Sequence, residues 1–84
     1  HSCNANVGFV TDTSLMALRD IAPGEMISND YAMTEFLVGF FPGFDCRCGE
    51  SECRRHVTVN DWRRPELQRR YAGFFTTAVQ ALID

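Results

Sequence analysis

The sequence predicts a small, mainly β fold with helices at its C-terminal end. Two runs of β-forming residues flank the stretch from Thr11 to Thr13 and indicate a hairpin. Apolar side chains recur at helical spacing after Pro65. Four cysteines, three of them between residues 46 and 53, can form disulfides or bind a metal ion. Because a chain of 84 residues buries only a modest core, we expect disulfides or a metal ion to support it.

The β signals lie in the first third of the chain. Residues 6 to 21 contain both runs of the predicted hairpin. Pro23 and Gly24 form a turn signal, and a third strand is expected over residues 26 to 31. Residues 32 to 45 are apolar but interrupted by two glycines and a proline, so they predict a covering loop with one helical turn.

Two short helices are expected near the C-terminus. Pro65 suits a first helical turn, and Gly73 is a natural stop. The predicted inner face of the first helix consists of Leu67, Tyr71 and Phe74, and that of the second of Phe75, Val79, Leu82 and Ile83.

Charge is distributed unevenly along the chain. Residues 1 to 53 hold two arginines against eight acidic residues, whereas residues 54 to 70 hold six arginines against two. The acidic part can attract a basic peptide, and the arginine-rich part can contact phosphate or an acidic partner. The plainer interpretation, which we favour, is two solvated faces. No apolar run approaches the length of a membrane span, and direct contact with nucleic acid is not expected.

The cysteines favour a metal site. Cys46 and Cys48 form a C-x-C pair, whose sulfurs are poorly placed to bridge each other but can converge on one ion. Gly49 lets the chain fold back so that Cys53 can join them. A structural zinc takes four ligands, and Cys3 completes the set. Two alternatives stay open: His1 or His56 as a ligand, and a disulfide framework.

Three ordered motifs resemble one enzyme family. The stretches "HSCNAN" (1 to 6), "ALRDIAPGEMISNDY" (17 to 31) and "FDCRCGESECR" (44 to 54) are similar to the C-terminal half of a SET domain and its post-SET motif. SET proteins are protein-lysine methyltransferases that use S-adenosylmethionine. The resemblance implies a partial SET β-fold over residues 1 to 45, a zinc-bound post-SET segment over 46 to 55, and a helical extension over 56 to 84.

The resemblance also implies roles for single residues. Tyr31 matches the catalytic tyrosine, and Asn6 matches a residue that holds the crossing of the chain beneath the active site. His1 and Ser2 lie in a segment that contacts the cofactor, and Phe44 matches an aromatic that packs near the adenine. The implied zinc ligands are Cys3, Cys46, Cys48 and Cys53. Methyl transfer needs alignment of a neutral amine more than acid–base work, so a tyrosine hydroxyl within aromatic walls suits it.

The chain departs from the family pattern at three positions. Ala5 stands where a proline is usual, and Arg55 stands where a glycine commonly follows "CR". Asn29 replaces a phenylalanine or tyrosine that helps set how many methyl groups are added. We expect Asn29 to leave a roomier pocket that permits multiple methylation.

These 84 residues do not include the family's Gly-rich cofactor motif or much of its peptide-binding surface. We therefore expect the chain alone to be inactive and to bind S-adenosylmethionine weakly or not at all. An alternative is a non-catalytic, zinc-stapled interaction module, with self-association through uncovered apolar surface. The opening residues show no leader pattern, so an intracellular protein is expected, either nuclear and chromatin-associated or from a bacterial cytoplasm.

Overall fold

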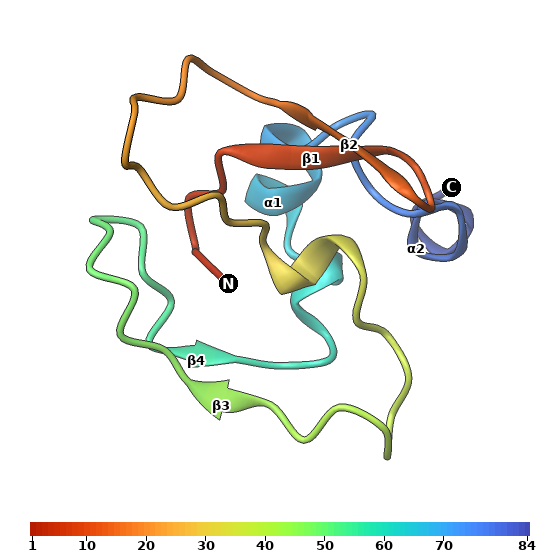
Figure 1. The fold of residues 1–84 in the computed structure, drawn as a ribbon. Coiled ribbons are helices and arrows are strands. Elements are labelled where there is room, and N and C mark those ends of the chain that lie inside the picture. The colour runs from red at the N-terminus through yellow and green to blue at the C-terminus, as the bar shows by residue number, and fades with distance from the viewer.

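Two small antiparallel sheets and two short α-helices make up the computed structural model, which describes residues 1 to 84 (Figure 1). In chain order the elements are β1 (Val7–Thr11), β2 (Ser14–Ala17), the 3-10 helix η1 (Tyr31–Met33), β3 (Phe44–Asp45), β4 (His56–Val57), the 3-10 helix η2 (Asp61–Arg63), α1 (Pro65–Arg70) and α2 (Thr77–Ile83). The predicted order, strands first and helices last, is confirmed. The α-helices hold as many residues as the strands, however, so the fold is not clearly mainly β.

The predicted hairpin forms from β1 and β2. The strands are antiparallel, with Val7 opposite Ala17 and an irregularity between Phe9 and Thr11. Gly8 packs directly on Phe74, because a Cβ at position 8 would lie 2.6 Å from the Cβ of Phe74. The Phe9 N–H also donates to the Phe74 carbonyl at 3.1 Å. The hairpin is therefore fastened to the connection between the two α-helices.

The third strand predicted over residues 26 to 31 does not form. Instead of a regular ladder, this segment makes scattered hydrogen bonds with the backbone N–H groups of Ser2, Asn6 and Val7 and with the Asn6 side chain. Asn6 donates through Nδ2 to the Met26 carbonyl at 2.8 Å and accepts at Oδ1 from the Ser28 N–H at 2.9 Å. The Ser28 carbonyl in turn accepts from the Asn6 N–H at 3.1 Å. The buried Asn6, together with backbone N–H groups of Ser2 and Val7, thus takes the place of a regular strand ladder.

The apolar loop that follows contains the expected helical turn. This turn is η1, and the Asp30 side chain caps it by accepting from the Ala32 N–H at 2.9 Å. The loop ends at β3, which pairs with β4 so that Phe44 lies opposite Val57. Gly43 is required here: its φ is +76°, and a Cβ would lie 2.6 Å from the Val57 carbonyl oxygen.

Both predicted helices are present. Pro65 occupies the first turn of α1, and Leu67 is buried. In α2 Val79 is buried and Ile83 packs against the core, but Leu82 is 48% exposed. The prediction of an inward Leu82 is therefore wrong, because a helix of two turns presents only a narrow stripe to its neighbours. Neither helix is long and apolar enough to cross a bilayer.

The main apolar core lies between the α-helices, η1 and the N-terminal segment. Its buried members are Ala5, Ala32, Met33, Leu67, Tyr71, Phe75 and Val79. A smaller cluster is built around Cys3, Cys46 and Val57. The N-terminus reaches this second cluster by passing between the hairpin and the β3–β4 pair (Figure 1).

Candidate metal centre and its aromatic neighbours

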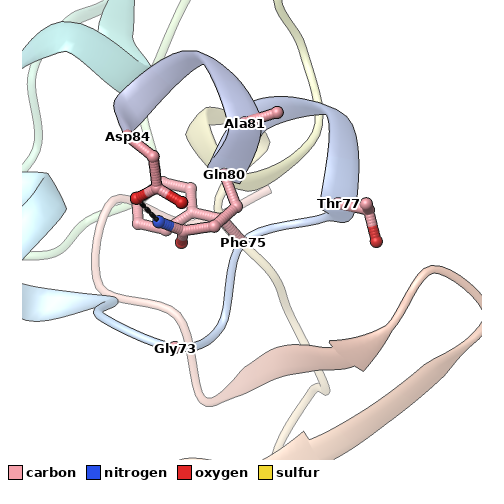
Figure 2. Close-up of a pocket in the computed structure, with 6 residues that line it drawn as sticks. All are labelled: Gly73, Phe75, Thr77, Gln80, Ala81 and Asp84. Carbon is pink, nitrogen blue, oxygen red and sulfur yellow. Dashed lines mark hydrogen bonds between the residues drawn. The ribbon is translucent and has the colours of Figure 1, made fainter.

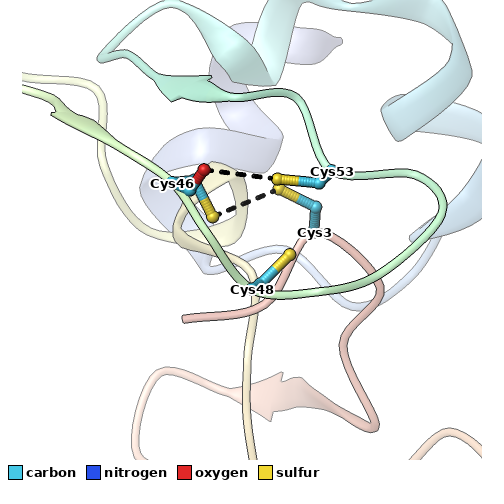
Figure 3. A group of neighbouring side chains, drawn as sticks. All are labelled: Cys3, Cys46, Cys48 and Cys53. Atoms are coloured by element: carbon cyan, nitrogen blue, oxygen red, sulfur yellow. Dashed lines mark hydrogen bonds between the residues drawn. The ribbon is translucent and has the colours of Figure 1, made fainter.

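The four cysteines converge, as predicted (Figure 3). Cys3 comes from the N-terminal segment and the other three from the loop between β3 and β4. All four Sγ atoms lie within 4.8 Å of one another, and those of Cys3 and Cys46 are 3.8 Å apart. Gly49, at φ +82°, makes the turn that brings Cys53 back to the pair. Two segments far apart in sequence therefore supply one compact donor set.

The spacing of the sulfurs fits a tetrahedral metal ion. With Zn–S bonds of about 2.3 Å, ligand sulfurs lie about 3.8 Å apart. All four cysteines are free, whereas a disulfide would need a separation of about 2.05 Å. A cluster of four thiols in place of two bonded pairs favours a metal centre over a disulfide framework. Of the histidine alternatives, His56 is exposed and pairs with Asp45 at 3.0 Å, away from the sulfurs.

His1 lies beside the sulfurs as a neighbour of Cys3. The Tyr31 N–H donates to Nδ1 of His1 at 3.0 Å, which leaves the ring proton on Nε2. Nε2 is 3.4 Å from the Sγ of Cys3, so the imidazole can donate to this sulfur. The ring thereby links the Cys3 sulfur to the backbone of Tyr31, as residues around a metal commonly orient its ligands.

Without an ion the cluster does not hold four thiolates easily. Burial raises the pKa of the Cys3 thiol to about 12 and also raises the pKa of Cys46. For Cys48 burial acts in the same direction, but hydrogen bonds from backbone N–H groups and neighbouring sulfurs outweigh it and lower its pKa to about 7. A divalent cation removes this conflict, because it attracts every thiolate at once.

Aromatic rings line one side of the cysteines. The ring of Tyr31 lies 5.1 Å from His1, 5.8 Å from Phe41 and 5.7 Å from Phe44, all edge to face. The Tyr31 hydroxyl has no hydrogen-bond partner within the chain and is not fully buried. The structure thus brings together three residues singled out in the sequence, Tyr31, His1 and Phe44.

Ser2 is placed differently. It is buried, its N–H donates to the Asn29 carbonyl at 3.0 Å, and its Oγ accepts from the Asn4 N–H at 3.1 Å. His1 and Ser2 both line a polar hollow of about 360 Å³, of which Phe44 is not a part. The Ser2 hydroxyl is therefore partly used within its own segment.

A larger surface hollow, of about 500 Å³, lies against α2 (Figure 2). It is lined by Gly73, Phe75, Thr77, Gln80, Ala81 and Asp84, and Gln80 donates to Asp84 at 2.8 Å. It shares no residue with the cysteine cluster or the aromatic cluster and contains no group of candidate catalytic residues.

A buried ionic network beside the cysteines escaped prediction. The guanidinium of Arg54 donates to both oxygens of Asp30, at 2.7 and 2.8 Å, and through Nε to Asp61 at 3.0 Å. The Tyr71 hydroxyl donates to Asp30 at 3.1 Å. The Arg54 side chain is only 5% exposed. Burial opposes its charge, but the two carboxylates outweigh burial and raise the pKa of Arg54.

The solvated-face interpretation of the arginine-rich stretch is thus wrong for Arg54, while Arg63 and Arg69 are exposed as expected. Composition gives no signal that separates one arginine of this stretch from the others. Asp30 and Arg54 are 24 residues apart, so only the fold reveals them as partners.

Comparison with protein-family models, curated proteins and solved structures finds no match for this chain. The site defines a class nonetheless: a small mixed α and β protein with a four-cysteine centre of metal-binding geometry.

Proposed function

We propose that the chain is the C-terminal part of an S-adenosylmethionine-dependent protein-lysine N-methyltransferase of the SET family, with zinc in its four-cysteine centre. One observation carries the proposal. Tyr31 stands edge to face with His1 and Phe44 directly beside the four sulfurs. With the exception of Ser2, the residues to which the resemblance gives catalytic, cofactor-binding and metal-binding roles are therefore neighbours in space, although they come from residues 1 to 53.

Two departures from the family pattern have physical accounts that support the proposal. Arg55 has φ +67°, in the left-handed region that glycine adopts most easily, and glycine is the residue the family commonly has there. The Ala5 N–H donates to the Tyr71 hydroxyl at 3.2 Å, a bond that the family's usual proline could not make. Tyr71 belongs to the C-terminal extension. The replacement of the family's usual proline by Ala5 therefore provides an N–H group that this extension binds.

The proposed zinc is structural. With four cysteine ligands no coordination position is left for substrate, so the ion fastens segments together and performs no chemistry of its own. It would be held by Cys3 on one side and by Cys46, Cys48 and Cys53 on the other. Bonds to these cysteines would keep His1, two residues before Cys3, and Phe44, two residues before Cys46, against Tyr31.

The proposed role of Tyr31 is to orient the lysine amine. Its hydroxyl is free of internal partners and can hydrogen-bond a neutral amine, while the surrounding rings favour an ammonium that has gained methyl groups. S-adenosylmethionine supplies the methyl group when bound. The neighbouring carboxylate, Asp30, is fully engaged by Arg54 and Tyr71, so it is not a free base. This arrangement suits a reaction driven by alignment.

The cofactor site of this chain is incomplete. His1 and Ser2 border the polar hollow of about 360 Å³, but Phe44 lies outside it, so this hollow does not gather all three predicted cofactor contacts. We expect these 84 residues alone to bind S-adenosylmethionine weakly or not at all and to show no turnover. Asn29 stands two residues before Tyr31, where the family carries a larger aromatic residue. Because a smaller side chain leaves more room for a methylated amine, we expect the complete enzyme to add more than one methyl group.

The test uses the longest reading frame that contains this chain. Transfer of labelled methyl groups from S-adenosylmethionine to lysine peptides is measured for the wild type and for Tyr31→Phe. We expect transfer by the wild type and its loss in the variant with the fold intact. Absence of transfer by a folded, zinc-loaded wild type, or full activity of Tyr31→Phe, would contradict the proposal.

A second candidate is a non-catalytic, zinc-stapled interaction module. It is favoured by a run of exposed apolar side chains in the loop before β3, where Leu37, Val38 and Phe40 are 50%, 79% and 84% exposed. Light scattering of the zinc-loaded chain tests it. Self-association that disappears in Phe40→Ser favours the module, whereas a monomer at high concentration argues against association through this loop.

A further inference from the structure

Arg54 touches two parts of the molecule at once. Its backbone N–H donates to the Sγ of Cys3 at 3.3 Å, directly at the metal centre. Its guanidinium binds Asp30 in a two-pronged pair and Asp61 through Nε. All three side chains are at most 5% exposed. A buried arginine in this position cannot move its backbone without disturbing both carboxylates.

Asp30 carries the connection onward to the turn that holds Tyr31. The Oδ1 atom of Asp30 accepts from Arg54 at 2.8 Å and from the Ala32 N–H at 2.9 Å. The second bond caps η1, whose first residue is Tyr31. A continuous set of hydrogen bonds therefore runs from the Cys3 sulfur, through Arg54 and Asp30, to the backbone around Tyr31.

We propose that Arg54 is a positioning residue that couples metal occupancy of the four-cysteine centre to the conformation of the Tyr31 turn. The inference rests on the metal-binding part of the proposed function and is independent of methyl transfer. When the metal draws Cys3 and Cys53 together, the backbone of Arg54 is fixed between them, since Arg54 follows Cys53 and donates to Cys3. Its side chain then holds Asp30 in the position that caps η1.

Arginine suits this role for two physical reasons. Four thiolates around a divalent ion leave excess negative charge, which the N–H···S bond and the nearby guanidinium both reduce. The planar guanidinium also reaches Asp30 and Asp61 in one rigid geometry. A lysine keeps the charge but has a single ammonium on a flexible stem, so it cannot hold both carboxylates in the same arrangement.

The experiment separates charge from positioning with Arg54→Lys. Arg69→Gln is a control, because the Arg69 side chain is exposed and forms no hydrogen bond within the chain. The 84-residue chain is titrated with Co²⁺ and with Zn²⁺. Sulfur-to-cobalt charge-transfer absorption reports ligation, and competition with a chelator gives affinity. The Tyr31 amide and ring resonances report the turn, but Tyr31 is also linked to Cys3 through His1. The Ala32 amide, which donates to Asp30, therefore reports the Arg54 route, and Val79 is a remote reference.

We expect zinc to shift the Tyr31 resonances of the wild type and of Arg69→Gln alike. In Arg54→Lys we expect metal affinity to fall about 10- to 100-fold. At saturating metal this variant should keep its charge-transfer absorption and the part of the Tyr31 shift that passes through His1, but lose most of the metal-induced shift of the Ala32 amide. Retained charge-transfer absorption with a lost shift in the turn identifies a positioning role for Arg54. A general loss of folding would instead remove both the absorption and the shift, and it would move the Val79 resonances as well.

Three results would overturn the inference. Metal saturation of the wild type that leaves the Tyr31 resonances unchanged would do so without any variant. Wild-type affinity and a full response of the Ala32 amide in Arg54→Lys would remove the role of Arg54 alone. Failure of the wild type to bind either metal would overturn the metal centre and the coupling together.

Discussion

The cysteine region and the helical core are held together by different forces. In the cysteine region the buried groups include sulfurs, carboxylates and a guanidinium beside Val57, and these polar groups require a metal ion or hydrogen bonds as compensation. In the helical core they are Leu67, Val79 and other apolar side chains, whose removal from water stabilises the fold without further partners. The comparison teaches that one half of a small fold can form by hydrophobic burial while the other depends on charge.

The turn η1 belongs to both regions. Tyr31 packs on the cysteine side against Phe44, whereas Ala32 and Met33 are buried in the helical core. Tyr71 makes the reverse connection, since its ring lies in the helical core and its hydroxyl binds Asp30. The residue proposed to act in catalysis thus stands where the two regions meet, and its position depends on both.

Metal removal should break the cysteine region most strongly. A structural zinc site contributes roughly 10–16 kcal/mol of apparent binding energy at neutral pH, so we expect a chelator to cost more than about 5 kcal/mol of stability. Lower pH should weaken metal binding, because the thiols must lose their protons to become ligands. Thermal unfolding with and without chelator measures the effect, and restored zinc should reverse it. An unchanged transition would contradict a structural metal.

Leu67→Ala should break the helical core while sparing the metal centre. Leu67 is 1% exposed, and truncating a buried leucine costs about 2–5 kcal/mol. Leu82→Ala is the matched control, because Leu82 is half exposed and should change stability by less than about 0.5 kcal/mol. Urea unfolding of both zinc-loaded variants gives the comparison. A strong loss of metal affinity in folded Leu67→Ala would show that the two regions are not energetically distinct.

Loss of the hydroxyl should destabilise the protein at Tyr71 and leave its stability nearly unchanged at Tyr31. Tyr71→Phe removes a buried hydrogen bond to a charged carboxylate, so we expect a loss of about 1.5–3 kcal/mol. Tyr31→Phe removes a hydroxyl without an internal partner and should leave stability within about 0.5 kcal/mol. Denaturant midpoints of the two variants and the wild type measure both stability changes. Equal losses would mean that the Tyr31 hydroxyl has a structural role.

The smallest effect is expected from an exposed ion pair outside both regions. A hydrogen bond from Arg19, helped by the Ala22 N–H and by Asn6, lowers the pKa of Glu25 from 4.5 to about 2. A lowered carboxyl pKa adds stability above pH 4.5 that disappears as the pH falls toward 2. The slight stability difference between the wild type and Glu25→Gln should shrink in that window. Both proteins lose metal in acid alike, and a Glu25 carboxyl titrating near 4.5 by NMR would contradict the prediction.

Several elements could be predicted because their signals are local. The hairpin follows from two β-forming runs around a short turn, and α1 follows from Pro65 and the spacing of apolar residues. The cysteine centre was also predictable, because a C-x-C pair, a nearby third cysteine and one distant cysteine leave few ways to complete four ligands. Each of these inferences needs only the types of residues and their spacing.

The sequence by itself therefore determined which residues can ligate a metal and which segments turn, pair or coil. Only the tertiary structure decided that Met26 and Ser28 bond to Asn6 where a strand was expected. The burial of Arg54 between Asp30 and Asp61 was likewise decided by the tertiary structure alone. The physical reason is that a charged side chain is equally compatible with water and with a buried partner. Whether a given arginine faces water or a buried carboxylate depends on groups that chain folding brings together from distant positions.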